Sequence, residues 1–242
     1  LRNRSSVIKG WLESLHDGRI HGNMWTIGTQ TFRCRHEVIV NLPGVNAPWG
    51  KELRELFIPD DDWKVVGADS SGNQLRGLCH YVGNDEFTNE VIYGDQHQRN
   101  ADALGCDRPT AKNYLYAYLF GAGDAKLGSI LTGKPNANAG KKSRPVFVSG
   151  EYQALNYLLQ TAEGITCKSA LSYAMNKIDE EGLRAEPRLF YHDEIAYVAH
   201  PDDADRVGEI LQESFKKGPE MFGVTCMEGG NYVIGSSYAD VH

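Results

Sequence analysis

Short β-runs and longer helical segments alternate along this chain, and this alternation constrains the fold most. Residues 63–68 are a β-branched run between turn residues, which favours a buried strand, and the run leads directly into Asp69. Residues 189–191 and 195–198 are two further β-runs, and residues 192–194 lie where a hairpin would turn. Strands and helices mixed in this way predict an α+β fold.

Residues 108–120 form the clearest predicted helix, because Asp107 can cap it, Pro109 is tolerated in its first turn and Gly121 follows its end. Residues 156–175 and 202–217 are predicted as further helices, and residues 1–15 as the end of another. In residues 156–175 the expected apolar side consists of Leu158, Leu159, Ala162, Ile165 and Leu171.

A polar stretch at residues 133–142, rich in Gly, Asn and Lys, precedes a strand-like run at residues 145–148. Such a composition indicates a linker, or a junction from which residues are missing.

Composition excludes several classes of protein. The 242 residues suffice for one large or two modest domains, and no apolar run is long enough for a membrane span or a secretion signal. We therefore expect no membrane partner and a cytoplasmic location. The five cysteines form no Cys-x-x-Cys pair, which argues against a disulfide framework or a zinc ribbon. The formal charge of −7 argues weakly against nucleic-acid binding, but it describes the whole surface and not one groove.

Two carboxylates end predicted β-segments. Asp69 follows the first strand and Asp193 lies in the predicted hairpin turn. Hard Mg²⁺ ions prefer oxygen ligands and keep several waters, so two carboxylates are enough for a two-metal phosphoryl-transfer site. Acidic residues at strand ends are also common as solvated turn residues, and for either aspartate taken singly that interpretation is the more frequent one.

One face of the helix at residues 108–120 carries two cations followed by two aromatic rings. Arg108, Lys112, Tyr116 and Phe120 fall at successive i+4 positions. Cations in the first turns of a helix are unfavourable beside its positive end unless an anion lies there, and a triphosphate is such an anion. The alternative is a solvated charged face with aromatic core residues further along.

Several ordered motifs resemble those of the family A, Pol I-type DNA polymerases, and most closely those of short-tailed phages. The string Arg108-x3-Lys112-x3-Tyr116-x3-Phe120-Gly121 resembles the O helix of that family. Residues 69–76 (DSSGNQLR) resemble its motif A and residues 191–194 (YHDE) its motif C. Further matches lie in the same order at residues 17–22, 31–33, 43–54, 94–97, 154–160 and 238–242. The resemblance implies a right-hand polymerase fold, with an antiparallel-sheet palm and helical fingers.

The resemblance also implies how the chain is divided. Residues 1–15 would end a thumb helix, residues 16–96 and 146–242 would form the palm, and residues 97–145 the fingers. The span from Gly121 to Asn156 is shorter than in phage relatives, so either this branch has lost finger helices or residues of a mobile piece are missing from the sequence. Expected partners are primer–template DNA, deoxynucleoside triphosphates, and either a preceding exonuclease and thumb polypeptide or a processivity factor.

By resemblance, the activity is template-directed addition of deoxynucleotides to a primer 3′-hydroxyl in phage DNA replication. Asp69 and Asp193 would hold two Mg²⁺ ions that activate the hydroxyl and stabilise charge on the α-phosphate, with Glu194 as an accessory carboxylate. Lys112 would also assist pyrophosphate departure. The implied nucleotide-binding residues are Ser70, Gln74, His97, Arg108, Lys112, Tyr116 and Phe120. The implied DNA-binding residues are Arg33, Asn156, Gln160, His192 and Gly121.

The chain departs from the family at two coupled positions. Gln74 stands where the family has a glutamate, and Phe120 where it has a tyrosine that hydrogen-bonds to that glutamate. Glutamine nearly matches glutamate in volume, so a steric gate against a ribose 2′-hydroxyl can survive. Two other functions remain open, a single-subunit RNA polymerase and a catalytically silent DNA-binding or replisome-assembly module. Gln74 favours DNA synthesis over the first, and joint retention of Asp69, Asp193, Arg108 and Lys112 argues against the second.

Overall fold

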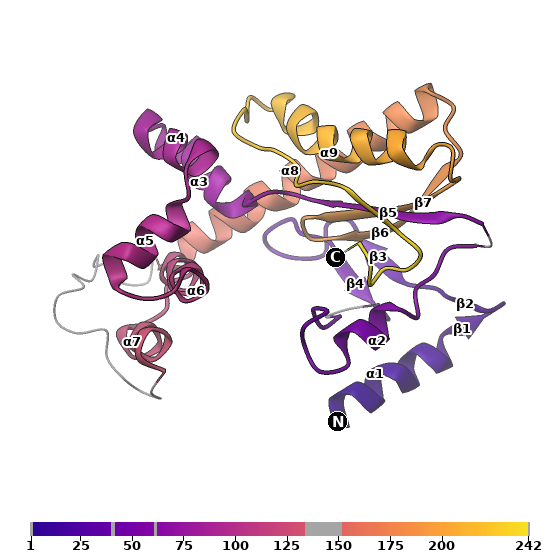
Figure 1. Cartoon of the computed structure of the whole chain (residues 1–242), viewed down its shortest axis with the longest axis horizontal. Coiled ribbons are helices and arrows are strands. Elements are labelled where there is room, and N and C mark those ends of the chain that lie inside the picture. Colours follow the sequence, from indigo (N-terminus) through magenta and orange to yellow (C-terminus); the bar gives the residue numbers. More distant parts are fainter. Residues whose placement is uncertain (1, 40–41, 61, 134–151, 242) are drawn as a thin grey trace. The chain divides into compact units, whose positions relative to one another are not determined.

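The computed structural model describes residues 2–39, 42–60, 62–133 and 152–241 (Figure 1). The chain forms two compact units. Unit 1 comprises Leu1–Asn73 and Glu163–His242, and unit 2 comprises Gln74–Ala162. Most of the expected polar linker and the strand-like run at residues 145–148 lie outside the described residues.

A four-stranded antiparallel sheet forms the centre of unit 1. Its strand order is β6 (Ala185–Tyr191), β7 (Glu194–Ala199), β5 (Lys64–Asp69) and β8 (Val233–Gly235). The strands expected at residues 63–68, 189–191 and 195–198 are therefore confirmed, as is the α+β fold class. In the register of β5 and β7, the last residue of one strand lies opposite the first residue of the other, so the two strands end together.

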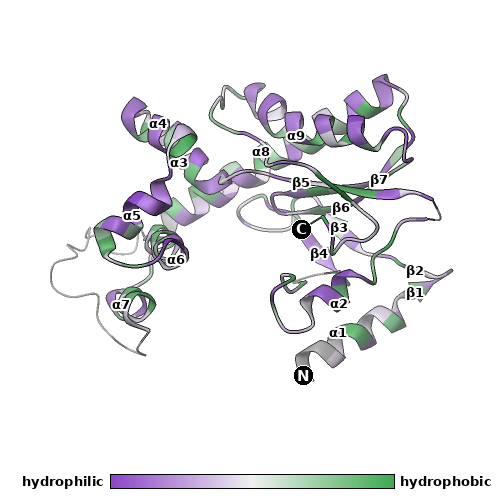
Figure 2. Ribbon diagram, in the orientation of Figure 1, coloured by the Kyte–Doolittle hydropathy of each residue, from purple (hydrophilic) through white to green (hydrophobic). Residues whose placement is uncertain are grey.

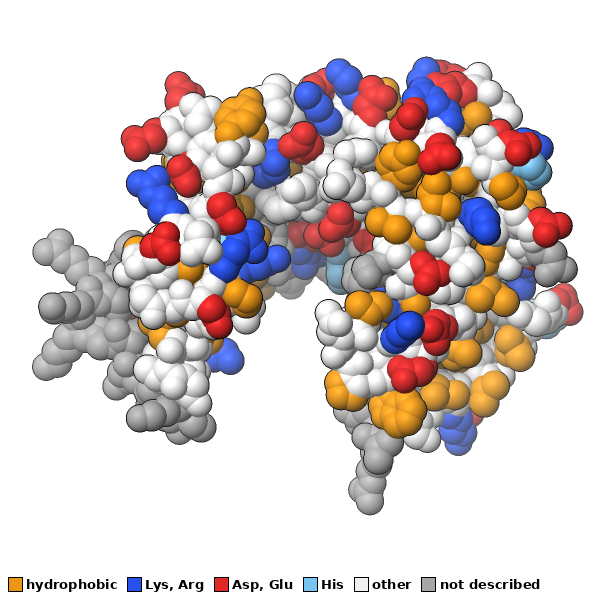
Figure 3. Space-filling view, in the orientation of Figure 1, with side chains coloured by type: hydrophobic (Ala, Val, Ile, Leu, Met, Phe, Trp, Pro, Cys, Tyr) orange, Lys and Arg blue, Asp and Glu red, His pale blue; other side chains and the backbone are white. Residues whose placement is uncertain are grey.

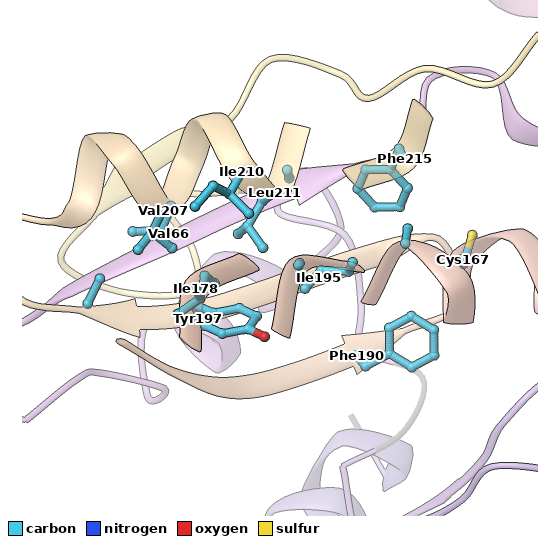
Figure 4. Close-up of a cluster of buried hydrophobic side chains, with 14 of the residues drawn as sticks. Val66, Cys167, Ile178, Phe190, Ile195, Tyr197, Val207, Ile210, Leu211 and Phe215 are labelled. Atoms are coloured by element: carbon cyan, nitrogen blue, oxygen red, sulfur yellow. The ribbon is translucent and has the colours of Figure 1, made fainter. Parts of the chain in front are cut away.

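Two helices contribute side chains to the main core of unit 1, α8 (Tyr152–Glu180) and α9 (Ala204–Glu220) (Figure 4). Val66 from β5 and Tyr197 from β7 meet Ile178 of α8 and Leu211 of α9, all of them buried. Full burial of an aliphatic or aromatic side chain contributes about 1.5–3 kcal/mol, so this cluster is the principal source of stability in unit 1.

The outer side of α9 is hydrophilic (Figure 2), and acidic and basic side chains are intermixed over it (Figure 3). Ion pairs join Arg206 to Glu181 and Lys217 to Glu220. This division into an apolar and a charged side is the amphipathic pattern expected for residues 202–217.

A second buried cluster includes Val65, Ala196 and Val198, which alternate along the strands with the residues of the main core, and Tyr238 from the segment after β8. Near it, Trp11 of α1 (Arg2–Glu13) contacts the edge of the Phe57 ring. The remaining elements of unit 1 are two short hairpins and one helix: β1 (Leu15–His16) with β2 (Arg19–Ile20), β3 (Asn23–Trp25) with β4 (Arg35–Glu37), and α2 (Gly50–Arg54).

Unit 2 is helical in its described part. It contains the first turns of α8, nearly all of α3 (Asn73–Val82), α4 (Asp85–Tyr93), α5 (Gln96–Leu104), α6 (Arg108–Leu119) and α7 (Asp124–Thr132). Asp107 caps α6 by accepting a 2.7 Å hydrogen bond from the Thr110 N–H, as predicted. Gly121 follows with φ +77°, a left-handed conformation that favours glycine at a helix end.

The apolar side expected for residues 156–175 is partly wrong. Leu159 is buried, but Leu158 and Ile165 are 41% and 39% exposed. The buried apolar residues Leu159, Cys167, Ala170 and Ala174 lie on one face of α8 at helical spacing, and Leu158 and Ile165 lie outside that face. In the part of the chain that the structure describes, no helix is both long and apolar enough to cross a membrane.

Candidate active site

Two strand ends bring Asp69 and Asp193 together in unit 1. Asp69 is the last residue of β5 and lies opposite Glu194, the first residue of β7. The Ser70 N–H donates a 2.8 Å hydrogen bond to the Asp193 carbonyl, so the backbone joins the two aspartate segments directly. Sheet register therefore makes neighbours of two carboxylates that are far apart in the sequence.

The electrostatics of this pair suit a cation. Burial raises the pKa of Asp193 to about 6, and the negative charges of Glu163 and Asp69 act in the same direction, while Arg33 opposes them. Adjacent carboxylates that repel one another are the donor set that a hard divalent cation prefers. Among the described residues there is no group of three or more His, Cys, Asp or Glu side chains that could hold a metal ion. The two aspartates fit Mg²⁺ as partial ligands, with water and substrate oxygens supplying the rest.

Glu194 is buried, and Tyr238 of the second cluster holds its side chain. The Tyr238 hydroxyl donates a 2.8 Å hydrogen bond to its carboxylate, and the Arg54 guanidinium lies 4.6 Å from the centre of the Tyr238 ring. Glu194 is thus opposite Asp69 in the sheet, with a fixed side chain. Its predicted place beside the aspartates agrees with this geometry, and its role as an accessory carboxylate stays a prediction.

A glycine loop packs against Asp69. The Gly230 N–H donates a 2.8 Å hydrogen bond to the Asp69 carbonyl, and a Cβ at this position would lie 2.3 Å from Asp69 Oδ1. A residue with a side chain would therefore displace the carboxylate. Gly230 was not among the residues predicted from the sequence, although the Gly229-Gly230 pair was a signal for close backbone approach.

Arg33 forms a partly buried ion pair that the sequence did not reveal. Its Nη2 lies 2.5 Å from Oε2 of Glu163, and the Glu163 side chain is only 3% exposed. Charge-assisted contacts of this kind fix a side chain firmly once both groups are desolvated. Arg33 therefore has a partner within the protein, and its expected contact with DNA stays a prediction.

His192 lies at the turn between β6 and β7 with φ +57°. Its ring centre is 4.4 Å from that of Tyr191 and 6.2 Å from that of His36. Burial lowers the pKa of His192, and the nearby Arg33 charge lowers it further. The imidazole is therefore neutral over a wider pH range than a free histidine.

In unit 2, α5 and α6 bring five of the predicted nucleotide-binding residues together. The His97 ring centre is 5.9 Å from that of Tyr116, which stacks on Phe120 at 6.1 Å. Burial lowers the pKa of His97, and the positive charges of Lys112 and then Arg108 lower it further. Two cations, an imidazole and two aromatic rings thus form one surface of unit 2.

The anion expected at the start of α6 is partly supplied by the protein itself. Arg108 Nε lies 2.8 Å from Asp95 Oδ2, and both side chains are about half exposed. An exposed ion pair of this kind is weak and can be exchanged for a more highly charged anion. The two cations in the first turns of α6 therefore do not by themselves require a triphosphate.

The other predicted residues are placed by their elements. Ser70 is buried directly after Asp69, and Gln74 lies in the first turn of α3, partly buried. Asn156 and Gln160 lie one turn apart on α8, where the Gln160 amide donates a 2.7 Å hydrogen bond to Asn156 Oδ1.

Comparison with known proteins shows which proteins the chain resembles. No family model matches the chain. Over most of its length, however, its homologues are phage DNA-directed DNA polymerases and bacterial DNA polymerases I.

Two of these relatives come from the phages T3 and T7. The DNA-directed DNA polymerases of Enterobacteria phage T3 and Escherichia phage T7 are each 27% identical to the chain, over 97% of its residues and 43% of their own. DNA polymerase I of Chloroflexus aurantiacus is 22% identical over 81% of the chain and 26% of its own length. The chain thus spans less than half the length of these curated relatives.

A solved structure shares the fold. It is described as the POL domain of Pol1 from M. smegmatis in complex with DNA primer-template and dNTP, and it matches 99% of the chain and 52% of its own with a TM-score of 0.79 at 16% identity. At this identity the likeness shows the fold alone. The mixed helical and antiparallel-sheet architecture is therefore that of a Pol I polymerase domain.

Proposed function

We propose that this chain is the catalytic core of a template-directed DNA polymerase, which adds deoxynucleoside triphosphates to a primer 3′-hydroxyl by two-metal phosphoryl transfer. The observation that carries the proposal is the juxtaposition of Asp69 and Asp193 at the end of one antiparallel sheet. Relatives over 97% of the chain that are DNA-directed DNA polymerases support it. Phage relatives also favour a role in phage DNA replication.

Unit 1 would supply the palm and the metal ligands. Two Mg²⁺ ions held by Asp69 and Asp193 would lower the pKa of the primer hydroxyl and stabilise charge on the α-phosphate. Glu194, fixed by Tyr238, would keep an additional negative charge beside Asp69. Gly230 would leave room for the Asp69 carboxylate to face the metal ions.

Unit 2 would supply the fingers and bind the incoming nucleotide. Arg108 would exchange its exposed bond to Asp95 for the triphosphate, because a highly charged anion competes well with a single carboxylate. Lys112 and His97 would donate to the same phosphates, and Lys112 would assist the leaving pyrophosphate. Tyr116 would stack beside the base and sugar. Gln74 and Ser70 complete the expected nucleotide set, with Gln74 and Phe120 as a neutral gate against ribose.

DNA contacts are assigned by the family resemblance alone. Arg33, Asn156, Gln160, His192 and Gly121 would contact primer–template DNA, and the two polar side chains on α8 are already oriented by their own hydrogen bond. Residues 1–15 would be the end of a thumb helix, and an exonuclease and thumb polypeptide or a processivity factor would be the protein partner. The expected palm and finger boundaries at residues 96–97 and 145–146 differ from the unit boundaries at Gln74 and Glu163, because nearly all of α3, all of α4 and the first turns of α8 belong to unit 2.

Primer extension tests the proposal. Asp69→Asn and Asp193→Asn should each slow nucleotide addition by about 10³-fold or more, because a positioned metal supplies several kcal/mol of transition-state stabilisation. Primer–template binding should persist. Asp85→Asn, at an exposed aspartate of α4, is the matched control and should extend normally.

Substantial extension by either site variant would refute the assignment. Wild-type protein that binds primer–template but never extends it would instead favour the silent DNA-binding module. Equal use of ribonucleotides and deoxynucleotides would favour an RNA polymerase.

A further inference from the structure

A small buried polar cluster lies at the turn that follows Asp69. It consists of Ser70, Asn73 and Cys167, which are 4%, 4% and 0% exposed. Asn73 Nδ2 lies 2.8 Å from Ser70 Oγ and 3.3 Å from Cys167 Sγ, and it donates to both. The cluster therefore links the turn after β5, the first residue of α3 and the interior of α8.

This polar cluster carries a cost in stability. Asn73 Oδ1 is buried without a hydrogen-bond partner among the described residues. An apolar side chain of similar volume would avoid that cost, since burial of an unpaired polar oxygen is unfavourable. A costly polar residue that nonetheless makes two directed hydrogen bonds is better explained by the geometry it fixes than by the stability it adds.

Ser70 transmits that geometry to both aspartates. It follows Asp69 directly, and its N–H donates to the Asp193 carbonyl while its hydroxyl accepts from Asn73. The next residue is held as well, because the Ser71 N–H donates a 2.9 Å hydrogen bond to the Glu228 carbonyl. The turn is thus fixed on one side by backbone contacts, and on the other by the Asn73 side chain.

We propose that Asn73 is a positioning residue for the metal site, which acts through Ser70 to hold Asp69 and Asp193 at the separation at which both carboxylates bind divalent cations. Asn73 touches neither cation nor substrate. This inference rests on the proposed function, since it assumes that the aspartates are metal ligands. Cys167 anchors the amide from the α8 side.

Mn²⁺ binding, measured by electron paramagnetic resonance, tests the inference without relying on catalysis. Asn73→Leu removes both hydrogen bonds while keeping a side chain that branches at Cγ, and it should weaken Mn²⁺ binding by about 10- to 100-fold, the usual effect of losing a residue that orients a metal ligand. Ser70→Ala should weaken it in the same way. In the double variant the two effects should not add, because both remove one link.

Two further variants separate positioning from stability. Val207→Ala trims a fully buried side chain of α9 that is not part of this cluster, so it should lower the unfolding midpoint and leave Mn²⁺ affinity unchanged. Cys167→Ser keeps an acceptor for the Asn73 amide and should retain most of the affinity.

The outcomes are distinct for the inference and for the proposed function. If wild-type protein binds Mn²⁺ and Asp69→Asn does not, but folded Asn73→Leu binds as wild type does, the inference is overturned and the metal site stands. Equal losses in Val207→Ala and Asn73→Leu would also overturn it, because general loosening would then be the cause. If wild-type protein binds no Mn²⁺, the proposed metal site fails, and this inference fails with it.

Discussion

The two units hold their candidate functional groups by different physical means. In unit 1, Asp69 ends β5 and Asp193 lies in the turn directly before β7, and the register of these two strands is fixed by a backbone ladder over a buried core. In unit 2, Arg108 is half exposed on a helix surface, and its described partner is an equally exposed carboxylate. Both clusters of buried apolar side chains belong to unit 1.

This difference is suited to different tasks. Metal ligands must be preorganised, because a small displacement costs much of the catalytic effect. Groups that bind and release a triphosphate can be mobile and can exchange partners, since their binding energy is recovered when the anion arrives. Perturbing the core should therefore impair unit 1 through its fold, whereas perturbing the helix surface should impair unit 2 through binding alone.

The largest expected effect breaks the scaffold of unit 1. Phe215 of α9 is 1% exposed, so Phe215→Ala should lower the free energy of unfolding by about 3–5 kcal/mol. All four tryptophans lie in unit 1, so urea unfolding followed by tryptophan fluorescence reports on this unit. Phe222→Ala, at a phenylalanine that is 61% exposed, is the matched control and should cost no more than about 0.5 kcal/mol. Equal costs at the two positions would contradict the packing described for α9.

The next effect should leave stability intact. Lys112→Ala and Arg108→Ala should each reduce kcat/KM for nucleotide addition by about 10²–10³-fold, or roughly 3–4 kcal/mol, because a charge-assisted contact to the triphosphate is lost. The tryptophan unfolding midpoint should not move. Lys126→Ala, at an exposed lysine of α7, should behave as wild type. Unchanged kinetics in the first two variants would mean that this side of α6 is an ordinary solvated helix face.

Local pattern predicted the elements of this fold better than it predicted their contacts. The strand expected at residues 63–68 is Lys64–Asp69, and the helix expected at residues 108–120 is Arg108–Leu119. Periodicity and capping are encoded by neighbouring residues, so a single sequence reveals them.

The partners of buried polar groups were not predictable in this way. Arg33 and Glu163 are 130 residues apart, Asn73 and Cys167 are 94 apart, and Tyr238 bonds to Glu194 across 44 residues. Only tertiary packing brings these pairs together. Motifs in the sequence therefore pointed to both aspartates but not to the residues that surround them, including Glu163, Gly230 and Asn73.

A coupling of intermediate size tests the gate in unit 2. Gln74→Glu alone should harm activity, because its carboxylate would lie beside a Phe120 ring that offers no donor. Phe120→Tyr alone should be milder, since glutamine can accept from the new hydroxyl. The double variant should recover much of the loss, with a coupling energy of roughly 0.5–3 kcal/mol in a double-mutant cycle of kcat/KM. Strict additivity would mean that the two side chains do not touch in the working enzyme.

Gln74→Ala completes that test, because the proposed gate excludes ribose by the size of the residue 74 side chain and not by its charge. It should open space for a 2′-hydroxyl and raise ribonucleotide incorporation. An unchanged ratio of ribonucleotide to deoxynucleotide incorporation would count against the placement of the gate at residue 74.

The smallest expected effect concerns an exposed ion pair of unit 1, which serves as the structural counterpart of the Arg108–Asp95 pair in unit 2. Arg206 and Lys177 hold the pKa of Glu181 at about 2, well below its usual 4.5. A carboxylate whose pKa is lower in the folded state adds stability that is fully present above pH 4.5 and is lost as the pH falls toward 2. Water and salt screen the pair, so the effect is small. In urea unfolding followed by tryptophan fluorescence, the unfolding midpoint of wild type should be slightly higher than that of Glu181→Gln at pH 6, and the two midpoints should converge near pH 2. High salt should reduce the difference at pH 6.

Asp95→Asn, in contrast, should leave the tryptophan midpoint unchanged and alter nucleotide binding, because its partner is a functional cation of unit 2. If Asp95→Asn shifts the midpoint and Glu181→Gln does not, the assignment of structural and functional ion pairs to the two units is reversed.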